Sequence, residues 1–186
     1  MAKKSLSKKK VNPILALVFV GLIVVIGIVI IFISRAADSP YVPAGYVLKW
    51  ADEFDGTTID TTKWNIANNS TYGSSNNEVQ CYMSSNVGLS GGNAVLTGKP
   101  GAGGCSGYSY TSGWIATGTK ATGGTEKYSF TQGYVEMRAK APQGNIFWPA
   151  LWLQGYNGGP SWPSYGEFDI TELYPACANM TTGTLH

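Results

Sequence analysis

The sequence predicts an all-β domain, an antiparallel β-sandwich, over residues 47–186. No long segment there has the spacing of apolar residues that an amphipathic helix requires. Glycine, asparagine and serine interrupt the chain at short intervals, and short segments between them alternate apolar and polar residues. The N-terminal region differs, because it contains one long apolar run. We therefore expect one β domain with an N-terminal appendage.

The N-terminal appendage has the composition of a membrane anchor. Its apolar run contains 21 residues without charge, and a spanning helix needs about 20. Five lysines precede the run, whereas only Arg35 directly follows it. The positive-inside rule then predicts a cytoplasmic basic tail at residues 1–12 and a transmembrane signal anchor at 13–34, which contacts the lipid bilayer and leaves the rest of the chain outside the cell. Cleavage near Ala36, with secretion of the body, is the alternative.

The charge balance changes after the anchor. Residues 36–186 contain seven basic and eleven acidic residues, a net charge of about −4. This balance excludes a basic nucleic-acid-binding domain, which needs lysine and arginine gathered on one face. Residues 35–46 include Pro40 and Pro43 and few core-forming side chains, so they predict an extended linker.

Three segments of the body have the pattern of strands. Asn93–Lys99 and Gly133–Lys140 alternate, and in the second Val135, Met137 and Ala139 share one apolar face. The third segment, Phe147–Leu153, is apolar on both faces. We expect it to lie centrally between two layers, although Pro149 lacks a backbone N–H for the ladder.

The cysteine and histidine content limits the disulfides and metal sites that the domain can contain. Cys81, Cys105 and Cys177 allow one disulfide in three pairings, with one thiol left over. Their spacings match no zinc pattern, and His186 is the single histidine in the sequence. We therefore predict no metal site from these residues.

Chemistry concentrates in the segment GEFDITELYP, residues 166–175. It contains Glu167, Asp169 and Glu172, three of the eleven acidic residues. In a regular strand Glu172 would point to the face opposite the other two. One extra residue in a β-bulge around Ile170–Thr171 would bring all three to one face, and bulges are common beside active sites.

Two glutamates flanking an aspartate suggest a glycosidase. Retaining enzymes of this class hold two carboxyl groups about 5–5.5 Å apart, and inverting enzymes about 6.5–9.5 Å apart. Glutamate side chains leaning over a shorter aspartate can meet the shorter distance. Because three neighbouring carboxylates do not ionise easily together, the proton should rest on the least solvated, which we expect to be Glu172.

The body resembles glycoside hydrolase family 16, in the laminarinase-like branch with the bulged E-x-D-x-x-E strand. That motif is residues 167–172. Four further landmarks follow the family order over about 140 residues: LKWADEFDGTTIDTTKW, NNEVQCY, GYVEMRAKAPQGNIFWPALWL and TLH. The resemblance implies a jelly roll similar to concanavalin A. It also implies that the catalytic domain at 47–186 is truncated, since the family continues through several more strands.

The resemblance implies a role for each acidic residue. Glu167 would be the nucleophile and Glu172 the general acid and then base, in a retaining double displacement. Asp169 would hydrogen-bond the nucleophile and keep the two glutamates electrically different. No cofactor is required, although a structural calcium is compatible with the family and Glu53 would be one ligand.

Several side chains are candidates for substrate binding. Indole rings offer flat apolar surfaces on which pyranose faces stack, and single tryptophans otherwise usually pack in the core. Arginine and asparagine can orient hydroxyl groups, and the resemblance places the histidine beside the cleft near Asp169. The candidates are Trp148, Trp152, Trp162, Arg138, Asn77 and His186.

Three functions follow from these observations. The first is a membrane-anchored, outward-facing hydrolase that cuts internal β-linkages of a polysaccharide, with β-1,3- or β-1,3/1,4-glucan favoured. The second is a polysaccharide-binding module of the same fold without turnover, which usually requires loss of a catalytic glutamate. Here Glu167 and Glu172 are both present. The third is an inactive gene fragment.

Overall fold

The structure is a computed structural model that describes residues 39–186 except 121, 143, 145, 156–160 and 175–179. The predicted anchor at 13–34 lies outside the described residues, as does Cys177. Within the described part of the chain, no helix has the length and apolarity needed to cross a bilayer.

The chain divides into two compact units, Met1–Glu53 and Phe54–His186. In the described part of the first unit, two backbone hydrogen bonds close turns. Val42 N–H donates to the carbonyl of Ser39, and Tyr46 N–H donates to the carbonyl of Pro43, each at 3.3 Å. The predicted linker therefore contains two local turns, one around Pro40 and one that begins at Pro43.

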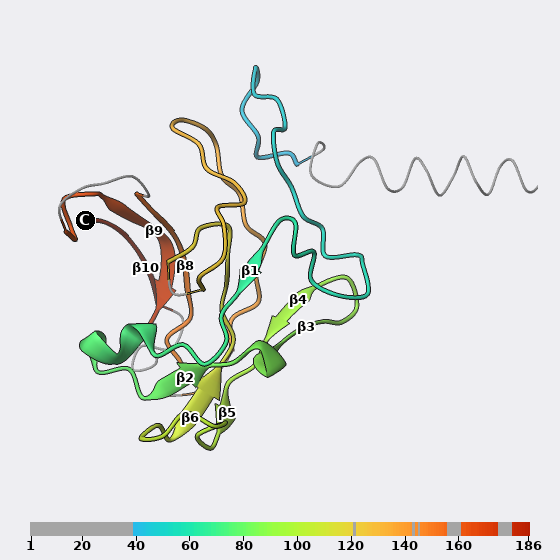
Figure 1. The fold of residues 1–186 in the computed structure, drawn as a ribbon. Helices are drawn as coiled ribbons and strands as arrows, with labels where there is room; N and C mark the ends of the chain where they lie inside the picture. The colour runs from blue at the N-terminus through green and yellow to red at the C-terminus, as the bar shows by residue number, and fades with distance from the viewer. Residues whose placement is uncertain (1–38, 121, 143, 145, 156–160, 175–179) are drawn as a thin grey trace, which may run out of the picture. The chain divides into compact units, whose positions relative to one another are not determined.

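The second unit is built from β-strands, which confirms the all-β prediction (Figure 1). The described residues form ten strands and two short 3₁₀ helices, and most strands are only two to five residues long. The strands are β1 (Asn65–Ile66), β2 (Gln80–Tyr82), β3 (Val87–Leu89), β4 (Ala94–Leu96), β5 (Lys99–Pro100), β6 (Tyr110–Ser112), β7 (Ile115–Ala116), β8 (Ala150–Gln154), β9 (Glu167–Leu173) and β10 (Thr181–Leu185), and the helices are η1 (Tyr72–Asn76) and η2 (Ser84–Asn86).

The strands form four small sheets. The sheet that carries the acidic segment has the order β10-β9-β8 and is antiparallel throughout. Two further pairs, β1-β7 and β3-β4, are also antiparallel. In the fourth sheet, β2-β6-β5, strands β2 and β6 run parallel. The prediction of an antiparallel sandwich is thus wrong for this pair, because β3, β4 and β5 form the long crossover that a parallel pair requires.

The prediction of a strand at Gly133–Lys140 is wrong. This segment has no ladder partner in the described part of the chain. Met137, expected on a dry face, is 41% exposed. Alternation of apolar and polar residues gives a segment two different faces, but a strand also needs a neighbour that takes its backbone hydrogen bonds.

The other two predicted strands form in part. The segment 93–99 contains β4 and the first residue of β5. In the segment 147–153, the strand begins only at Ala150, and β8 is an edge of the described sheet rather than a central strand. Pro149 lies just before it and contributes its carbonyl, which accepts the Leu173 N–H at 3.2 Å. Because proline lacks a backbone N–H, the strand begins at Ala150, the residue after Pro149.

A disulfide joins β2 to the loop before β6. It links Cys81 and Cys105, whose Cα atoms are 6.2 Å apart, within the range that a disulfide spans. Both residues are buried. The structure therefore selects one of the three pairings that the sequence left open.

Candidate active site

The three carboxylates of β9 share one face because the strand is bulged. Against β8, Leu151 pairs with Thr171 and the next residue, Trp152, pairs with Asp169. Ile170 is therefore the extra residue, and the pairing with β10 shifts at the same place. This confirms the predicted bulge at Ile170–Thr171, which restores Glu172 to the face of Asp169.

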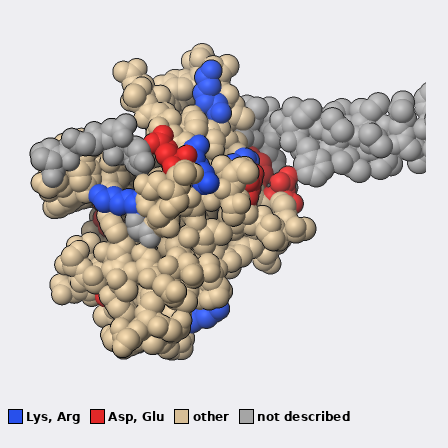
Figure 2. Space-filling view, viewed as in Figure 1, with Lys and Arg blue, Asp and Glu red and all other residues tan. Residues whose placement is uncertain are grey.

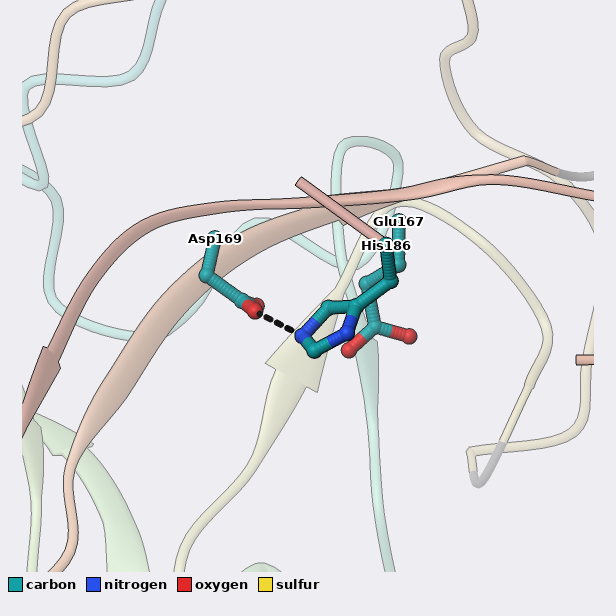
Figure 3. Close-up of side chains that lie close together, drawn as sticks. All are labelled: Glu167, Asp169 and His186. Atoms are coloured by element: carbon teal, nitrogen blue, oxygen red, sulfur yellow. Dashed lines mark hydrogen bonds and ion pairs between the residues drawn. The ribbon is translucent and has the colours of Figure 1, made fainter. Parts of the chain in front are cut away.

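Glu167, Asp169 and Glu172 form a row of three carboxylates along β9. Asp169 is the buried member of this row and is only 3% exposed. Its Oδ2 lies 3.1 Å from Nε2 of His186, as Figure 3 shows. Burial raises the pKa of the Asp169 carboxyl above its ordinary value, and the charges of Glu172 and Glu167 raise it further. The hydrogen bond from His186 opposes these effects and lowers the pKa.

The expectation that Glu172 is the least solvated carboxylate is wrong. Glu172 and Glu167 are half-buried, whereas Asp169 is buried. The central position of Asp169 explains this, since its shorter side chain lies between the two longer ones and beside the histidine ring. The hydrogen bond predicted between Asp169 and the nucleophile is replaced in the described structure by the bond to His186.

Glu167 is held from both neighbouring strands. Its backbone carbonyl accepts the N–H of His186 at 2.9 Å, next to β10. On the β8 side its cross-strand partner is Gln154, whose amide nitrogen donates a short hydrogen bond to Oε2 of Glu167. Figure 3 shows the Glu167 carboxylate beside the imidazole ring of His186. The Glu167 carboxylate therefore lies beside the imidazole ring of His186 and accepts a hydrogen bond from the uncharged amide of Gln154.

Glu172, at the other end of the row, contacts two aromatic residues. The indole Nε1 of Trp148 donates to Oε1 at 2.9 Å, and the hydroxyl of Tyr174 approaches Oε2 at 3.4 Å. The two rings also contact each other, with centroids 4.6 Å apart. Trp148 is 59% exposed, so its ring can contact a sugar while its N–H holds the carboxylate.

The other two predicted tryptophans differ in exposure. Trp162 is 51% exposed, and its ring centroid lies 5.4 Å from that of His186. Trp152 is half-buried beside Asp169 and packs edge-to-face on Trp114 at 5.7 Å. Trp114 in turn contacts Tyr72 and Tyr82. Trp162 thus offers an open ring at the Glu167 end, whereas Trp152 connects the acidic sheet to an aromatic cluster.

Arg138 and Asn77 are not brought to the row. In the described part of the chain neither makes a hydrogen bond or ion pair with the three carboxylates. Arg138 is exposed in the unpaired segment before β8. Asn77 ends η1 with φ of 62°, a left-handed conformation that asparagine tolerates well. A substrate contact for either residue stays a prediction.

Comparison with known proteins supports the resemblance seen in the sequence. No family profile matches the chain. The chain is 36% identical over 158 residues to a glucan endo-1,3-beta-glucosidase A1 of Niallia circulans, and 33% identical over 150 residues to a glucan endo-1,3-beta-glucosidase of Cryptopygus antarcticus. These matches cover 77% and 76% of the chain.

The fold of this chain is also similar to the folds of solved structures. A laminarinase from Flavobacterium sp. UMI-01 superposes with a TM-score of 0.62 at 33% identity, covering 75% of the chain and 57% of the laminarinase. An endo-beta-1,3(4)-glucanase from family GH16 superposes with a TM-score of 0.65 at 31% identity, covering 78% of the chain and 59% of the enzyme. The chain is thus similar in sequence and in fold to laminarinase-like enzymes of glycoside hydrolase family 16. Its sheets match the laminarinase-like jelly roll of that family.

The chain spans only part of the length of the curated relatives that it matches. It covers 22% of the Niallia protein and 51% of the Cryptopygus protein. The described residues nevertheless contain the whole of the bulged strand β9, so the site can be described from this chain.

Three residues of the site could also hold a metal ion. Glu167, Asp169 and His186 each present one ligand atom, and these atoms lie within 4.8 Å of one another. A metal there would displace the bond between Asp169 and His186. Glu53, the candidate calcium ligand, does not belong to this group of described residues.

The face drawn in Figure 2 has scattered charges among neutral residues. Basic side chains on it are dispersed rather than gathered in one patch.

Sequence reasoning missed three residues of the site: Gln154, Tyr174 and Trp114. Gln154 ends an apolar run, and only the bulged register places it opposite Glu167. Tyr174 directly follows the acidic segment, so its position two residues after Glu172 was an available signal. Trp114 lies in a distant segment, and no local pattern connects it with Trp152.

Substitution of Asp169 tests its electrostatic environment. Because the folded state raises the pKa of this carboxyl, its ionisation destabilises the fold. The stabilising effect of the protonated form is complete below the unfolded pKa and is lost as pH rises through the folded pKa. We expect Asp169→Asn to melt at a higher temperature than the wild type at neutral pH, with the difference vanishing at strongly acidic pH. Thermal melts across pH measure this, and a difference that grows on acidification would contradict it.

Proposed function

We propose that this chain carries the catalytic centre of an endo-acting β-glucan hydrolase, with β-1,3- or β-1,3/1,4-linked glucan as substrate. One observation carries the proposal: the bulge of β9 gathers Glu167, Asp169 and Glu172 on one face, with a separate donor at each glutamate. The names of the relatives support the substrate class, since two are glucan endo-1,3-beta-glucosidases.

The mechanism that fits this geometry is a double displacement with retention. An oxygen of Glu167 attacks the anomeric carbon while the glycosidic bond breaks, and Glu172 gives its proton to the leaving oxygen. Glu172 then takes a proton from water, the water oxygen attacks the anomeric carbon, and the bond to Glu167 breaks. Exposed rings flank the row at both ends, Trp162 near Glu167 and Trp148 at Glu172, and these are the proposed sugar platforms.

The two glutamates should respond differently to substitution in the full-length protein. Glu167→Ala should abolish turnover, because no covalent glycosyl-enzyme forms. Glu172→Ala should be nearly inactive on glucan but recover its first step on an activated aryl β-glycoside, whose leaving group needs no proton. General acid–base help is worth about 10²–10⁴-fold, so the recovery is measurable.

Azide provides the control for this assignment. It should replace the water in Glu172→Ala and yield a β-glycosyl azide. Rescue of Glu167→Ala with an α-azide, while Glu172→Ala stays inactive on the activated substrate, would reverse the two roles. In the wild type, NMR should show the β-anomer as the first product of laminarin, and initial release of the α-anomer would exclude retention.

Trp148 should act through both its N–H and its ring. Trp148→Phe keeps an aromatic surface but removes the donor to Glu172, so we expect kcat to fall about 3–30-fold with little change in KM. Trp148→Ala also removes the ring and should raise KM. Trp162→Phe is the matched control, since Trp162 makes no hydrogen bond to a carboxylate of the row in the described structure, and it should keep kcat. Equal kcat losses in Trp148→Phe and Trp162→Phe would contradict the donor role.

We also propose that residues 13–34 anchor the protein in the membrane with the catalytic domain outside. The support is the 21-residue apolar run and the lysines before it. We expect the full-length protein to remain with the membrane fraction after an alkaline carbonate wash and its domain to be digested by external protease. Recovery of a soluble exported protein beginning near Ala37 would show instead that the segment is a cleaved signal.

A further inference from the structure

Gln154 occupies a fixed position beside the acidic row. It is the last residue of β8 and pairs directly with Glu167, the first residue of β9. Its amide nitrogen donates to Oε2 of Glu167, and both residues are half-buried. No other amide side chain in the described residues contacts this carboxylate.

The backbone around this pair leaves little freedom for another arrangement. The N–H of Gly155 donates to the carbonyl of Gly166 at 2.9 Å. A Cβ at Gly155 would lie 1.7 Å from the carbonyl oxygen of Tyr165, so only glycine allows this close approach. The ends of β8 and β9 are thereby held together, and Gln154 is kept opposite Glu167.

A primary amide is well suited to a nucleophilic carboxylate. It stays neutral at all working pH values, so its donor is always available. A donor on one oxygen fixes the rotation of the carboxylate. Because Gln154 binds Oε2, Oε1 remains available for attack. Glu172 instead has an indole and a phenol as partners, so the two glutamates differ in their surroundings.

We propose that Gln154 is a positioning residue for the nucleophile, which orients Glu167 so that Oε1 faces the anomeric carbon. The inference rests on the proposed function, and it adds a residue from β8 to the three carboxylates. Gln154 acts on the first displacement, in which the bond between Glu167 and the anomeric carbon forms while the glycosidic bond breaks.

Two substitutions of Gln154 test this role in the full-length protein. Gln154→Met keeps the length of the side chain without the donor, and Gln154→Glu keeps its polarity but replaces the donor with an acceptor. Gln132→Met is the matched control, since Gln132 is exposed outside any strand. The probe is an activated 2-deoxy-2-fluoro β-glucoside, which traps the glycosyl-enzyme and reports the first displacement alone.

We expect both Gln154 variants to lower the rate constant of trapping about 10–100-fold, with KM for laminarin changed less than about twofold. Melting temperatures should stay near that of the wild type, and Gln132→Met should match the wild type throughout. Unchanged trapping in either folded Gln154 variant would overturn the proposal. A rise in KM with unchanged kcat would also overturn it, because it would indicate substrate binding rather than orientation of the nucleophile.

A crystal structure of Gln154→Met separates this inference from the proposed function. We expect the Glu167 side chain to leave its wild-type rotamer or to occupy more than one. A single unchanged rotamer would overturn the positioning role even if the enzyme is active. Conversely, an inactive wild-type protein would reject the proposed function. If Glu167 is nevertheless displaced in the variant, Gln154 still orients the Glu167 side chain.

Discussion

The site depends on one backbone irregularity, the bulge at Ile170 in β9. Period-two alternation would send Glu172 to the face opposite Glu167 and Asp169. The extra residue reverses this, and the pairing of β9 with both of its neighbours shifts at the same place. Because β9 is paired on both sides, the two neighbouring strands fix the bulge. The three carboxylates therefore share a face through the register of three strands rather than through their own side chains.

The bulge also accounts for the electrostatics of the row. It places Asp169 between two glutamates and beside His186, where burial and two neighbouring charges raise the pKa of its carboxyl. Such a group is costly to ionise in the folded state, and the hydrogen bond from His186 offsets part of that cost. The aromatic partner of Asp169 across the sheet, Trp152, packs on Trp114 and so attaches the row to the rest of the domain.

The sequence predicted those features that depend on local pattern. The all-β class and the bulge at Ile170–Thr171 follow from residues close together in the chain. The aromatic rings near the carboxylates were instead predicted from the segments that carry the family resemblance, because Trp148 is 24 residues from Glu172. Pairing depends on distant residues, and there the predictions were weaker. The segment 133–140 alternates but has no strand partner in the described structure, and β2 pairs with β6 in parallel across a long crossover. For the same reason the role of Gln154 was not visible, because it requires the bulged register.

The proposed roles of the two glutamates have a consequence for the aspartate between them. Before the first displacement, Glu167 is the charged neighbour of Asp169 and Glu172 holds a proton. After it, Glu167 is an uncharged ester and Glu172 carries the charge. Both glutamates act on the pKa of Asp169 in the same direction, so one negative neighbour is present in each state. With these roles the negative charge moves from one end of the row to the other during the first displacement, and the Asp169 carboxyl has a charged neighbour on one side both before and after it.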